Sequence, residues 1–557
     1  MHCSWRAGRL ALLIVVGPAA ALGQGSSAAT DSAAAVDRIF ANWNSRQTPG
    51  CAVGVARNGQ TILERAYGMA NLEYDVPTTL ATIFEAGSVS KQFTAAAVVL
   101  LAQQGKLALD DEVSKYIPEL PDYEAPVTIR QMLHHTSGLR DWGTVALAMG
   151  WPRGTRAHTH AHVLDIVSRQ ESLNYTPGAE YLYSNTNYNL AAIMVERVSG
   201  MSFAEFTRKH LFEPLGMTST QWRDDYTRIV KGRATAYGRG RQGGWGLEMP
   251  FEDVHGNGGL LTTVGDLLKW NENFVRPRVG GVAFVRDLQQ KGRLTSGREI
   301  SYALGLVVSS HQGVPEVSHT GATAGYRAFL ARYPDQHLSV ALLCNAGNAS
   351  PSMGQRIADI FLSGQTRLAA RQAGEPGATL PLDQITEKAG VYRNLNTNEA
   401  MRLVVRDGKL QVDGGPELTP LSRTVFRTPN GSVGTFEFGA KGLPAILRLA
   451  TAGGDTVGYL LEQSWTPMPA DLRSYLGEYA SNEAETTFRV TLEEGGKLML
   501  RGRYGRSLEL VPAYRHAFTT SNGPALVLFR RDARGRVTTM SFGMGRVRDL
   551  QFRRVGR

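Results

Sequence analysis

The chain has 557 residues, of which 42% are hydrophobic and 20% are charged, and its formal net charge is +10. This composition is that of an ordinary soluble protein, and the length predicts about three or four domains instead of one core. Arginine is spread through the chain and no basic stripe is interleaved with aromatic residues, which argues against a nucleic-acid partner.

The first 23 residues have the pattern of a secretory signal peptide. Arg6 and Arg9 precede an apolar run from Leu10 to Val16, and small residues follow as far as Gly23. The pattern predicts cleavage near Gly23 and a periplasmic or secreted protein. No other stretch of the sequence is long enough to span a bilayer.

A helix and a hairpin are predicted next. Residues 31–43 carry apolar side chains at helical spacing after capping residues, which predicts an amphipathic helix packed on a sheet. Residues 51–57 and 60–67 then read as two strands joined by Asn58-Gly59, a dipeptide typical of tight hairpin turns.

Ser88 and Lys91 stand three residues apart on a predicted helix from Ser88 to Gln104, which stops at Gly105. The segment is apolar nearly all round, so the helix belongs inside the protein, and residues three apart share one face. Burial disfavours an ammonium, so the lysine can act as a proton acceptor. Backbone N–H groups at a helix start can stabilise an oxyanion. Together these features are typical of an acyl-transferring serine hydrolase.

Two adjacent histidines, His134 and His135, raise the question of a metal. Thr128 and Gln131 form a capping-box pattern that predicts a helix starting there, and adjacent helical residues point in different directions. The sequence shows no further ligand cluster, so we predict neither a metal site nor a cofactor.

Three more strands are predicted after this helical middle, at residues 316–320, 326–333 and 338–344. Early and late strands that join one antiparallel sheet, with helices between them, define an α+β domain, which we assign to residues 30–364.

Beyond this domain the pattern changes. Residues 365–384 are rich in Ala, Gly, Pro and Gln and are predicted to be a linker. Short alternating strands follow, and the segment repeats itself: Gly390-Val391-Tyr392 matches Gly477-Glu478-Tyr479. We predict two small antiparallel β-barrel domains, at residues 385–465 and 468–557.

Two further motifs join the Ser88 motif, namely Tyr183-Ser184-Asn185 and His319-Thr320-Gly321. With Ser88-Val89-Ser90-Lys91, these resemble the three motifs of the class C β-lactamase and serine DD-peptidase superfamily. The resemblance covers about residues 34–362. Together with the two trailing β-domains, the architecture is similar to that of bacterial D-aminopeptidases.

The resemblance implies a role for each motif residue. Ser88 is the expected nucleophile and Lys91 its proton acceptor. Tyr183 is the expected partner acid or base, and its proton affinity has to fall beside Lys91 and His319 if it is to act as a base.

Substrate contacts follow from the same resemblance. Asn185 is expected to bind a substrate amide, Thr320 and Gly321 to line the cleft, and Ala322 N–H to complete the oxyanion hole with Ser88 N–H. His319 stands where the β-lactamase pattern has a lysine. A histidine is charged only conditionally near neutral pH, so strong carboxylate recognition is not predicted, and His319 is expected to orient Tyr183.

Two cysteines remain in the mature chain, Cys51 and Cys344, on strands that are antiparallel neighbours in the family's sheet. Either they form a disulfide or they are two buried free thiols. The restricted geometry of disulfides between adjacent strands favours the free thiols.

The leading functional prediction is hydrolysis of amide bonds in small D-amino-acid-containing peptides, of D-aminopeptidase or DD-peptidase type. Alternatives are a short-chain carboxylesterase, a β-lactamase, and a catalytically silent penicillin-binding or cell-wall-sensing protein. The expected partners are a small peptide, ester or β-lactam substrate and peptidoglycan fragments. The sequence does not predict an oligomeric state.

Overall fold

The computed structural model describes His2 and residues 24–363, 377–429, 432–439, 442–450, 456–521 and 523–556. The predicted signal peptide, His2 aside, therefore lies outside the described residues, as does the predicted linker up to residue 376.

The centre of the first domain is a six-stranded antiparallel sheet in the order β10-β11-β12-β13-β1-β2. Its strands are β1 (Cys51–Arg57), β2 (Gln60–Tyr67), β10 (Val307–His311), β11 (Val314–Thr323), β12 (Tyr326–Tyr333) and β13 (Leu338–Cys344). Asn58 and Gly59 join β1 to β2 with φ values of 53° and 76°, the conformation that tight hairpin turns need. Early and late strands thus share one sheet, as predicted.

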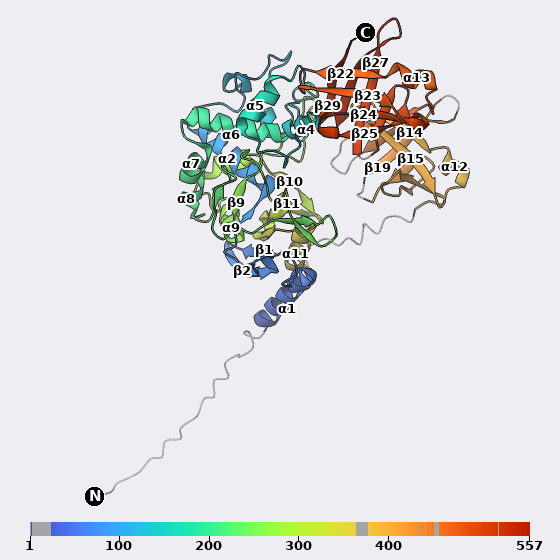
Figure 1. Ribbon diagram of the computed structural model, residues 1–557. Coiled ribbons are helices and arrows are strands. Elements are labelled where there is room, and N and C mark those ends of the chain that lie inside the picture. The colour runs from blue at the N-terminus through green and yellow to red at the C-terminus, as the bar shows by residue number, and fades with distance from the viewer. Residues whose placement is uncertain are drawn as a thin grey trace.

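Helices cover both faces of this sheet. On one face α1 (Gln24–Ile39) and α11 (Ser352–Leu362) pack together, with Val36, Phe40 and Ile357 in a shared apolar cluster. Figure 1 shows α1 and α11 beside β1 and β2. On the other face lie α2 (Lys91–Gln103) and α9 (Val264–Glu272), which belong to the larger core of the molecule. Gly54 of β1 leaves room there for Leu268 of α9.

A helical subdomain extends the second face, and its α3 starts at the predicted capping box of Thr128 and Gln131. Its helices are α3 (Ile129–Leu133), α4 (Trp142–Ala148), α5 (His160–Ser168), α6 (Asn185–Ser199), α7 (Phe203–Thr207), α8 (Glu213–Leu215) and α10 (Gly281–Gln289). Short strands connect it to the sheet: β3 (Met69–Asn71), β4 (Val76–Pro77), β5 (Phe84–Glu85), β6 (Gln221–Trp222), β7 (Tyr237–Arg239), β8 (Trp245–Leu247) and β9 (Leu260–Thr262).

Two eight-stranded antiparallel units follow, which confirms the predicted fold class. The first, introduced by α12 (Leu382–Thr386), contains β14 (Gly390–Asn394), β15 (Ala400–Arg406), β16 (Lys409–Val412), β17 (Thr419–Pro420), β18 (Val425–Arg427), β19 (Val433–Phe438), β20 (Pro444–Ala450) and β21 (Thr456–Glu462). The second, introduced by α13 (Pro469–Ser474), contains β22 (Gly477–Ser481), β23 (Thr486–Leu492), β24 (Leu498–Arg501), β25 (Ser507–Tyr514), β26 (Ala517–Thr520), β27 (Gly523–Arg531), β28 (Val537–Met544) and β29 (Val547–Val555).

The second unit is a closed barrel, and a bridge between Gln411 and Glu417 brings the first close to closure. The predicted internal repeat has a structural counterpart. Tyr392 and Tyr479 are both buried, and each donates its hydroxyl hydrogen bond to the backbone carbonyl four residues earlier, at 3.0 Å and 2.8 Å.

The second barrel docks on the helical subdomain, as Figure 1 shows for β29 and α4. One apolar cluster runs without interruption from the first domain into this barrel. At the junction the guanidinium of Arg140 pairs with the carboxylate of Glu483, and both are almost completely buried. Arg506 donates to the carbonyl of Leu147, the next-to-last residue of α4, at 2.8 Å. Within the described residues, the structure holds no helix with the length and apolarity needed to cross a membrane.

Candidate active site

Ser88 lies in a tight 3-10 turn, Gly87–Ser90, that runs into α2. The regular helix therefore begins at Lys91, three residues later than predicted. Gly87 has φ +50°, and a Cβ atom there would lie 2.6 Å from the backbone nitrogen of Ala322. The turn is held from both sides, because Ser90 Oγ donates to the Gly87 carbonyl at 2.6 Å and accepts from Leu260 N–H at 3.1 Å.

Lys91 is completely buried, and its Nζ lies 3.2 Å from Ser88 Oγ. The same nitrogen donates to Asn185 Oδ1 at 3.0 Å and to the Asn257 carbonyl at 2.6 Å. Burial lowers the pKa of Lys91 well below its usual value, and the positive charges of Arg546 and Arg153 lower it further. A neutral amine has two hydrogens, which the two carbonyl groups take, so its lone pair faces Ser88. This geometry suits a proton acceptor.

Tyr183 precedes α6 and lies in a cluster of aromatic rings. Its ring lies 4.2 Å from that of His135, and Lys91 Nζ stands 4.8 Å from its centroid. Burial raises the pKa of Tyr183 above its usual value, although its hydrogen bond with Ser88 works in the opposite direction. The structure thus contradicts the predicted fall in proton affinity. The reason is that burial destabilises a phenolate and also lowers the pKa of Lys91 beside it, so Tyr183 keeps its proton and can serve as an acid.

His319 sits on β11, and burial lowers its pKa to about 4. Its ring nitrogens contact Tyr302 Oη at 3.1 Å and the Thr320 carbonyl at 2.6 Å. The ring centroids of His319 and Tyr183 are 6.4 Å apart. His319 and Tyr183 are thus linked through Tyr302, whose ring meets that of Tyr183 edge-on at 6.1 Å. Nothing in the sequence indicated Tyr302.

A cleft of about 370 Å³ opens above Ser88 and brings most of the predicted residues together. Its lining consists of Gly87, Ser88, Arg153, Tyr183, Asn185, Asn257, Gly258, His319, Thr320, Ala322, Thr323 and Arg546. Lys91 lies beneath the cleft. Gly321 does not line it: a Cβ atom at Gly321 would lie 2.0 Å from the Ala86 carbonyl, so this glycine allows β11 to approach the nucleophile turn. This approach places Ala322 N–H beside the turn that carries Ser88 N–H.

Six residues of the lining were not among the predicted site residues, namely Gly87, Arg153, Asn257, Gly258, Thr323 and Arg546. Asn257 precedes the glycine pair 258–259, and its carbonyl binds Lys91 while its side chain accepts from Asn189 Nδ2 at 2.7 Å. Arg153 comes from the loop after α4 and Arg546 from the β28–β29 turn of the second barrel. A barrel residue more than 450 positions from Ser88 carries no local signal for membership of this site.

The two adjacent histidines do not share a site. His134 places its ring nitrogens 3.0 Å from the carbonyls of Arg130 and Gln290. His135 Nδ1 lies 3.2 Å from Ser184 N–H and 3.0 Å from Asn187 Nδ2.

One cluster with ligand atoms suited to a metal does occur in the described part of the chain. His160, Glu196 and His255 place such atoms within 4.8 Å of one another. The two histidine rings are tilted by 39° to each other with centroids 4.2 Å apart, and His160 Nε2 and His255 Nδ1 already contact backbone groups. Because one nitrogen of each ring is already engaged by the backbone, the contacts present are those of a packed histidine pair.

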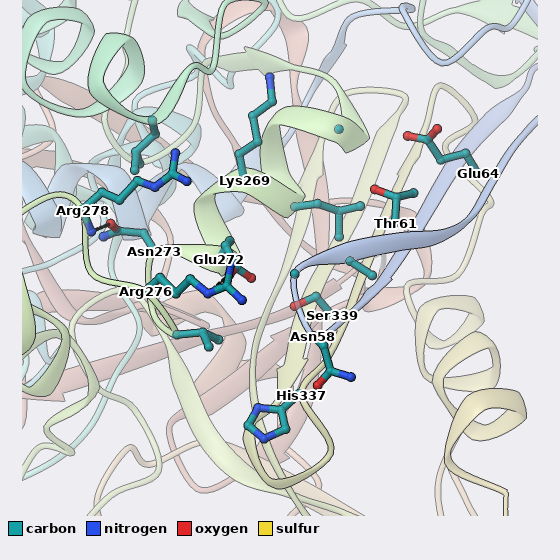
Figure 2. A pocket seen from close by; sticks show the side chains of 16 residues that line it. Asn58, Thr61, Glu64, Lys269, Glu272, Asn273, Arg276, Arg278, His337 and Ser339 are labelled. Carbon is teal, nitrogen blue, oxygen red and sulfur yellow. Dashed lines mark hydrogen bonds and ion pairs between the residues drawn. The ribbon is translucent and has the colours of Figure 1, made fainter.

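A second hollow of about 370 Å³ lies between the β1–β2 hairpin and the end of α9 (Figure 2). Arg276 pairs there with Glu272, and Lys269 pairs with Asp266. None of the predicted catalytic or substrate-binding residues lines this hollow. The chemistry expected from the sequence is therefore located at the Ser88 cleft.

Cys51 and Cys344 lie directly opposite each other in the β1–β13 pair and are joined in a disulfide. Free thiols were the favoured alternative from sequence, and the structure differs from that expectation. The direct register of the two residues brings their Cα atoms to 4.0 Å, which places the sulfur atoms together.

The β-lactamase family profile matches residues 34–365. A D-aminopeptidase of Brucella anthropi is 26% identical over 527 residues, which are 91% of this chain and 95% of that protein. Penicillin-binding protein 4* of Bacillus subtilis is 30% identical over 313 residues, 52% of this chain and 66% of that protein.

Solved structures of low sequence identity share the fold. The octameric penicillin-binding protein homologue from Pyrococcus abyssi matches 77% of this chain and 99% of its own, with a TM-score of 0.53 and 21% identity. The D-amino acid amidase from Ochrobactrum anthropi SV3 matches 61% of this chain and 99% of its own, with a TM-score of 0.52 and 20% identity.

Proposed function

This chain belongs to the β-lactamase family and is a serine hydrolase, and we propose that it cleaves amide bonds in small D-amino-acid-containing peptides through an acyl-enzyme on Ser88. The observation that carries the proposal is the Ser88–Lys91 pair. A buried amine whose pKa is lowered by burial stands 3.2 Å from a hydroxyl at the floor of a cleft. The choice of D-peptides is supported by D-aminopeptidase relatives that match 91% of the chain.

Acylation needs one proton transfer to the enzyme and one away from it. The lone pair of Lys91 takes the Ser88 proton as Oγ forms a bond to the carbonyl carbon. Ser88 N–H and Ala322 N–H stabilise the oxyanion that develops. Tyr183 then gives its proton to the leaving nitrogen and regains one from Lys91, and the C–N bond breaks.

Deacylation reverses the roles. A water molecule loses a proton to neutral Lys91 and adds to the ester carbonyl, and the bond to Ser88 Oγ breaks as the serine regains its proton.

Asn185 contributes to substrate binding. Its Oδ1 is held by Lys91, which leaves its Nδ2 group to bind a substrate carbonyl. The same contact keeps Lys91 pointed at Ser88.

Two experiments test the proposal. Fluorescent penicillin and a fluorophosphonate, followed by mass analysis, should label Ser88 in the wild-type protein and give no adduct in Ser88→Ala. Lys91→Met, which keeps the side-chain volume, should label at least 100-fold more slowly, since general-base help contributes about 10²–10⁴ in rate. Ser296→Ala, an exposed serine, is the matched control and should label at the wild-type rate.

A substrate panel decides the class of bond. The proposal expects D-alanyl peptides and amides to be cleaved faster than their L-counterparts, p-nitrophenyl esters and nitrocefin. Turnover of esters alone would make the protein an esterase, and rapid nitrocefin hydrolysis would make it a β-lactamase. Labelling without turnover of any of them would indicate a silent penicillin-binding protein.

Export to the periplasm or the medium is part of the proposal. It is supported by the signal-like pattern of residues 1–23 and by the Cys51–Cys344 disulfide, because disulfides persist in oxidising compartments. Mass analysis of the protein from its native compartment should give a mature chain starting near residue 24. A full-length chain recovered with the cytoplasmic fraction would refute export.

A further inference from the structure

The β28–β29 turn of the second barrel is fastened to the rim of the Ser88 cleft by its backbone. The carbonyl of Arg546 accepts from Asn174 Nδ2 at 3.0 Å and from Asp141 N–H at 3.4 Å. Two residues on, Arg548 N–H donates to Asn174 Oδ1 at 2.8 Å. The position of this turn over the cleft is therefore set by main-chain contacts and does not depend on the Arg546 side chain.

The Arg546 side chain lines the cleft together with Ser88. Its guanidinium lies 4.7 Å from the centroid of the Tyr183 ring, and 43% of the side chain remains exposed. Its carboxylate neighbour is Asp141, at 3.7 Å. The same oxygen of Asp141 already accepts from Asn185 N–H at 2.8 Å. Donor groups of Arg546 are thus left for a ligand in the cleft.

The other basic groups of the cleft are either buried with lowered pKa values or paired with a carboxylate. Lys91 and His319 have lowered pKa values because they are buried. Arg153 binds both oxygens of buried Glu252, one of them at 2.8 Å. Arg546 is therefore the group that offers an accessible positive charge to a substrate.

The charges around the cleft do not balance. In the described part of the molecule the ion pairs form two separate groups: Arg153, Arg223 and Arg233 pair with Glu85 and Glu252, and Arg546 pairs with Asp141. Over both groups the four arginines exceed the three carboxylates by one positive charge, and Arg546 is the most exposed of the four arginines. A bound carboxylate would complete the balance, whereas a substrate ammonium would add to the excess.

We propose that Arg546, supplied by the second barrel, is the carboxylate-binding residue of the Ser88 cleft, so that the preferred substrates carry a free carboxylate on the leaving residue. The leaving side is indicated because Arg546 lies over Tyr183, the residue assigned to protonate the leaving nitrogen. A guanidinium binds a carboxylate through two parallel hydrogen bonds, which the neutral His319 cannot do. This inference rests on the proposed function, since it concerns the substrate of the same site.

The test compares N-acetyl-D-alanyl-D-alanine with its C-terminal amide. For wild-type protein, kcat/KM should be about 10–100-fold higher for the free acid, the range expected for a charge-assisted hydrogen-bonded pair. Arg546→Gln should bring the ratio of the two kcat/KM values close to one. Arg546→Lys should give an intermediate ratio because it keeps the charge and loses the bidentate geometry.

The matched control is Arg530→Gln, which removes an exposed arginine of the same barrel that pairs with Asp549. It should leave the ratio of the free acid to the amide unchanged. High salt applied to the wild-type protein provides a measurement without mutation and should reduce the ratio. A wild-type ratio near one, or a ratio that Arg546→Gln does not change, would overturn the inference.

Failure of the proposed function has a different signature. If Ser88 is not labelled and neither peptide is cleaved, the proposed function itself is wrong. If Ser88 is labelled and both peptides are cleaved equally by wild type and Arg546→Gln, only the role of Arg546 is wrong.

Discussion

The buried pair of Arg140 and Glu483 should hold the second barrel on the hydrolase domain, and its removal is expected to be costly. The side chains of Arg140 and Glu483 are 1% and 3% exposed. Arg140 also donates to Ser172 Oγ at 2.9 Å and to the carbonyls of Arg548 and Asp549, both at 3.2 Å. Since Arg548 and Asp549 follow the turn that carries Arg546, this pair fixes the base of that turn.

The magnitude follows from burial. Arg140→Met leaves the buried Glu483 carboxylate without its charged partner, and its remaining partner, Glu171 N–H at 2.9 Å, is neutral. Glu483→Leu in turn leaves the buried guanidinium of Arg140 with neutral partners only. Each single change should lower the free energy of unfolding by about 3–5 kcal/mol, the usual cost of an uncompensated buried charge. The double variant removes both charges and should come within about 2 kcal/mol of wild type. The coupling energy of the cycle is then at least about 4 kcal/mol.

Urea unfolding followed by tryptophan fluorescence measures this cycle. The apolar core is continuous between the hydrolase domain and the second barrel, so the two should unfold together. The exposed pair of Arg489 and Glu478 on the same barrel, 66% and 43% exposed, is the matched control and should couple by less than about 1 kcal/mol. Single variants of the buried pair that cost less than about 1 kcal/mol, or a double variant that costs their sum, would refute the reasoning.

Three further predictions concern the site and its frame. Gly87→Ala should lower kcat at least tenfold because the added Cβ would press on Ala322 N–H. The control is Gly105→Ala, at φ +68° in open space, which should change stability but not kcat. Equal losses of kcat in the two variants would contradict this prediction. Reduction of the Cys51–Cys344 disulfide should lower Tm, because the bond closes a loop between cysteines 293 positions apart and so restricts the unfolded chain. The loss of unfolded-chain entropy stabilises the folded protein by at most roughly 5–6 kcal/mol. An unchanged Tm with reductant would show that the bond adds nothing. His319 stays neutral above its pKa of about 4. Profiles of kcat/KM against pH between pH 5.5 and 8 should therefore have the same shape in the wild type and in His319→Gln. If the fall in activity at low pH disappears in the variant, this prediction is wrong.

The Ser88–Lys91 pair was predictable because local sequence carries it, whereas the roles of Tyr183, Asn185 and His319 came from the family resemblance. A spacing of three residues places Ser88 and Lys91 on one face of any helix or 3-10 turn, and an apolar helix implies burial. The hairpin at Asn58-Gly59 and the capping box at Thr128 were equally local signals. Each of these features depends on contacts within four residues of the chain, so no knowledge of the fold was needed.

The electrostatics were harder to predict because they depend on what surrounds each group. Tyr183 was expected to lose proton affinity beside two cations, but burial lowers the pKa values of Lys91 and His319 and raises the pKa of the phenol. Burial of Tyr183 comes from the rings of His135 and Tyr302, which lie far from it in sequence. Arg546 was missed for the same reason: a turn of a different domain gives no sign in its own sequence of the cleft that it covers.

The position of Arg546 suggests why its charge is useful beyond substrate binding. In the free protein, the positive charge of Arg546 helps to keep the pKa of Lys91 low, so the amine is ready to accept a proton. A substrate carboxylate paired with Arg546 would offset that field and raise the proton affinity of Lys91, at the stage when Lys91 takes the proton of Ser88. The activating group thereby becomes more basic when its base function is needed.

This coupling can be measured from pH profiles. The profile of kcat/KM reports on groups of the free enzyme and that of kcat on groups of the substrate complex. Activity should rise with pH as Lys91 loses its proton, because the neutral amine is the active form. With N-acetyl-D-alanyl-D-alanine the midpoint of this rise should lie at higher pH in kcat than in kcat/KM, and with the C-terminal amide the two midpoints should coincide. In Arg546→Gln the difference for the free acid should vanish; if it persists, the field of Arg546 does not act on Lys91.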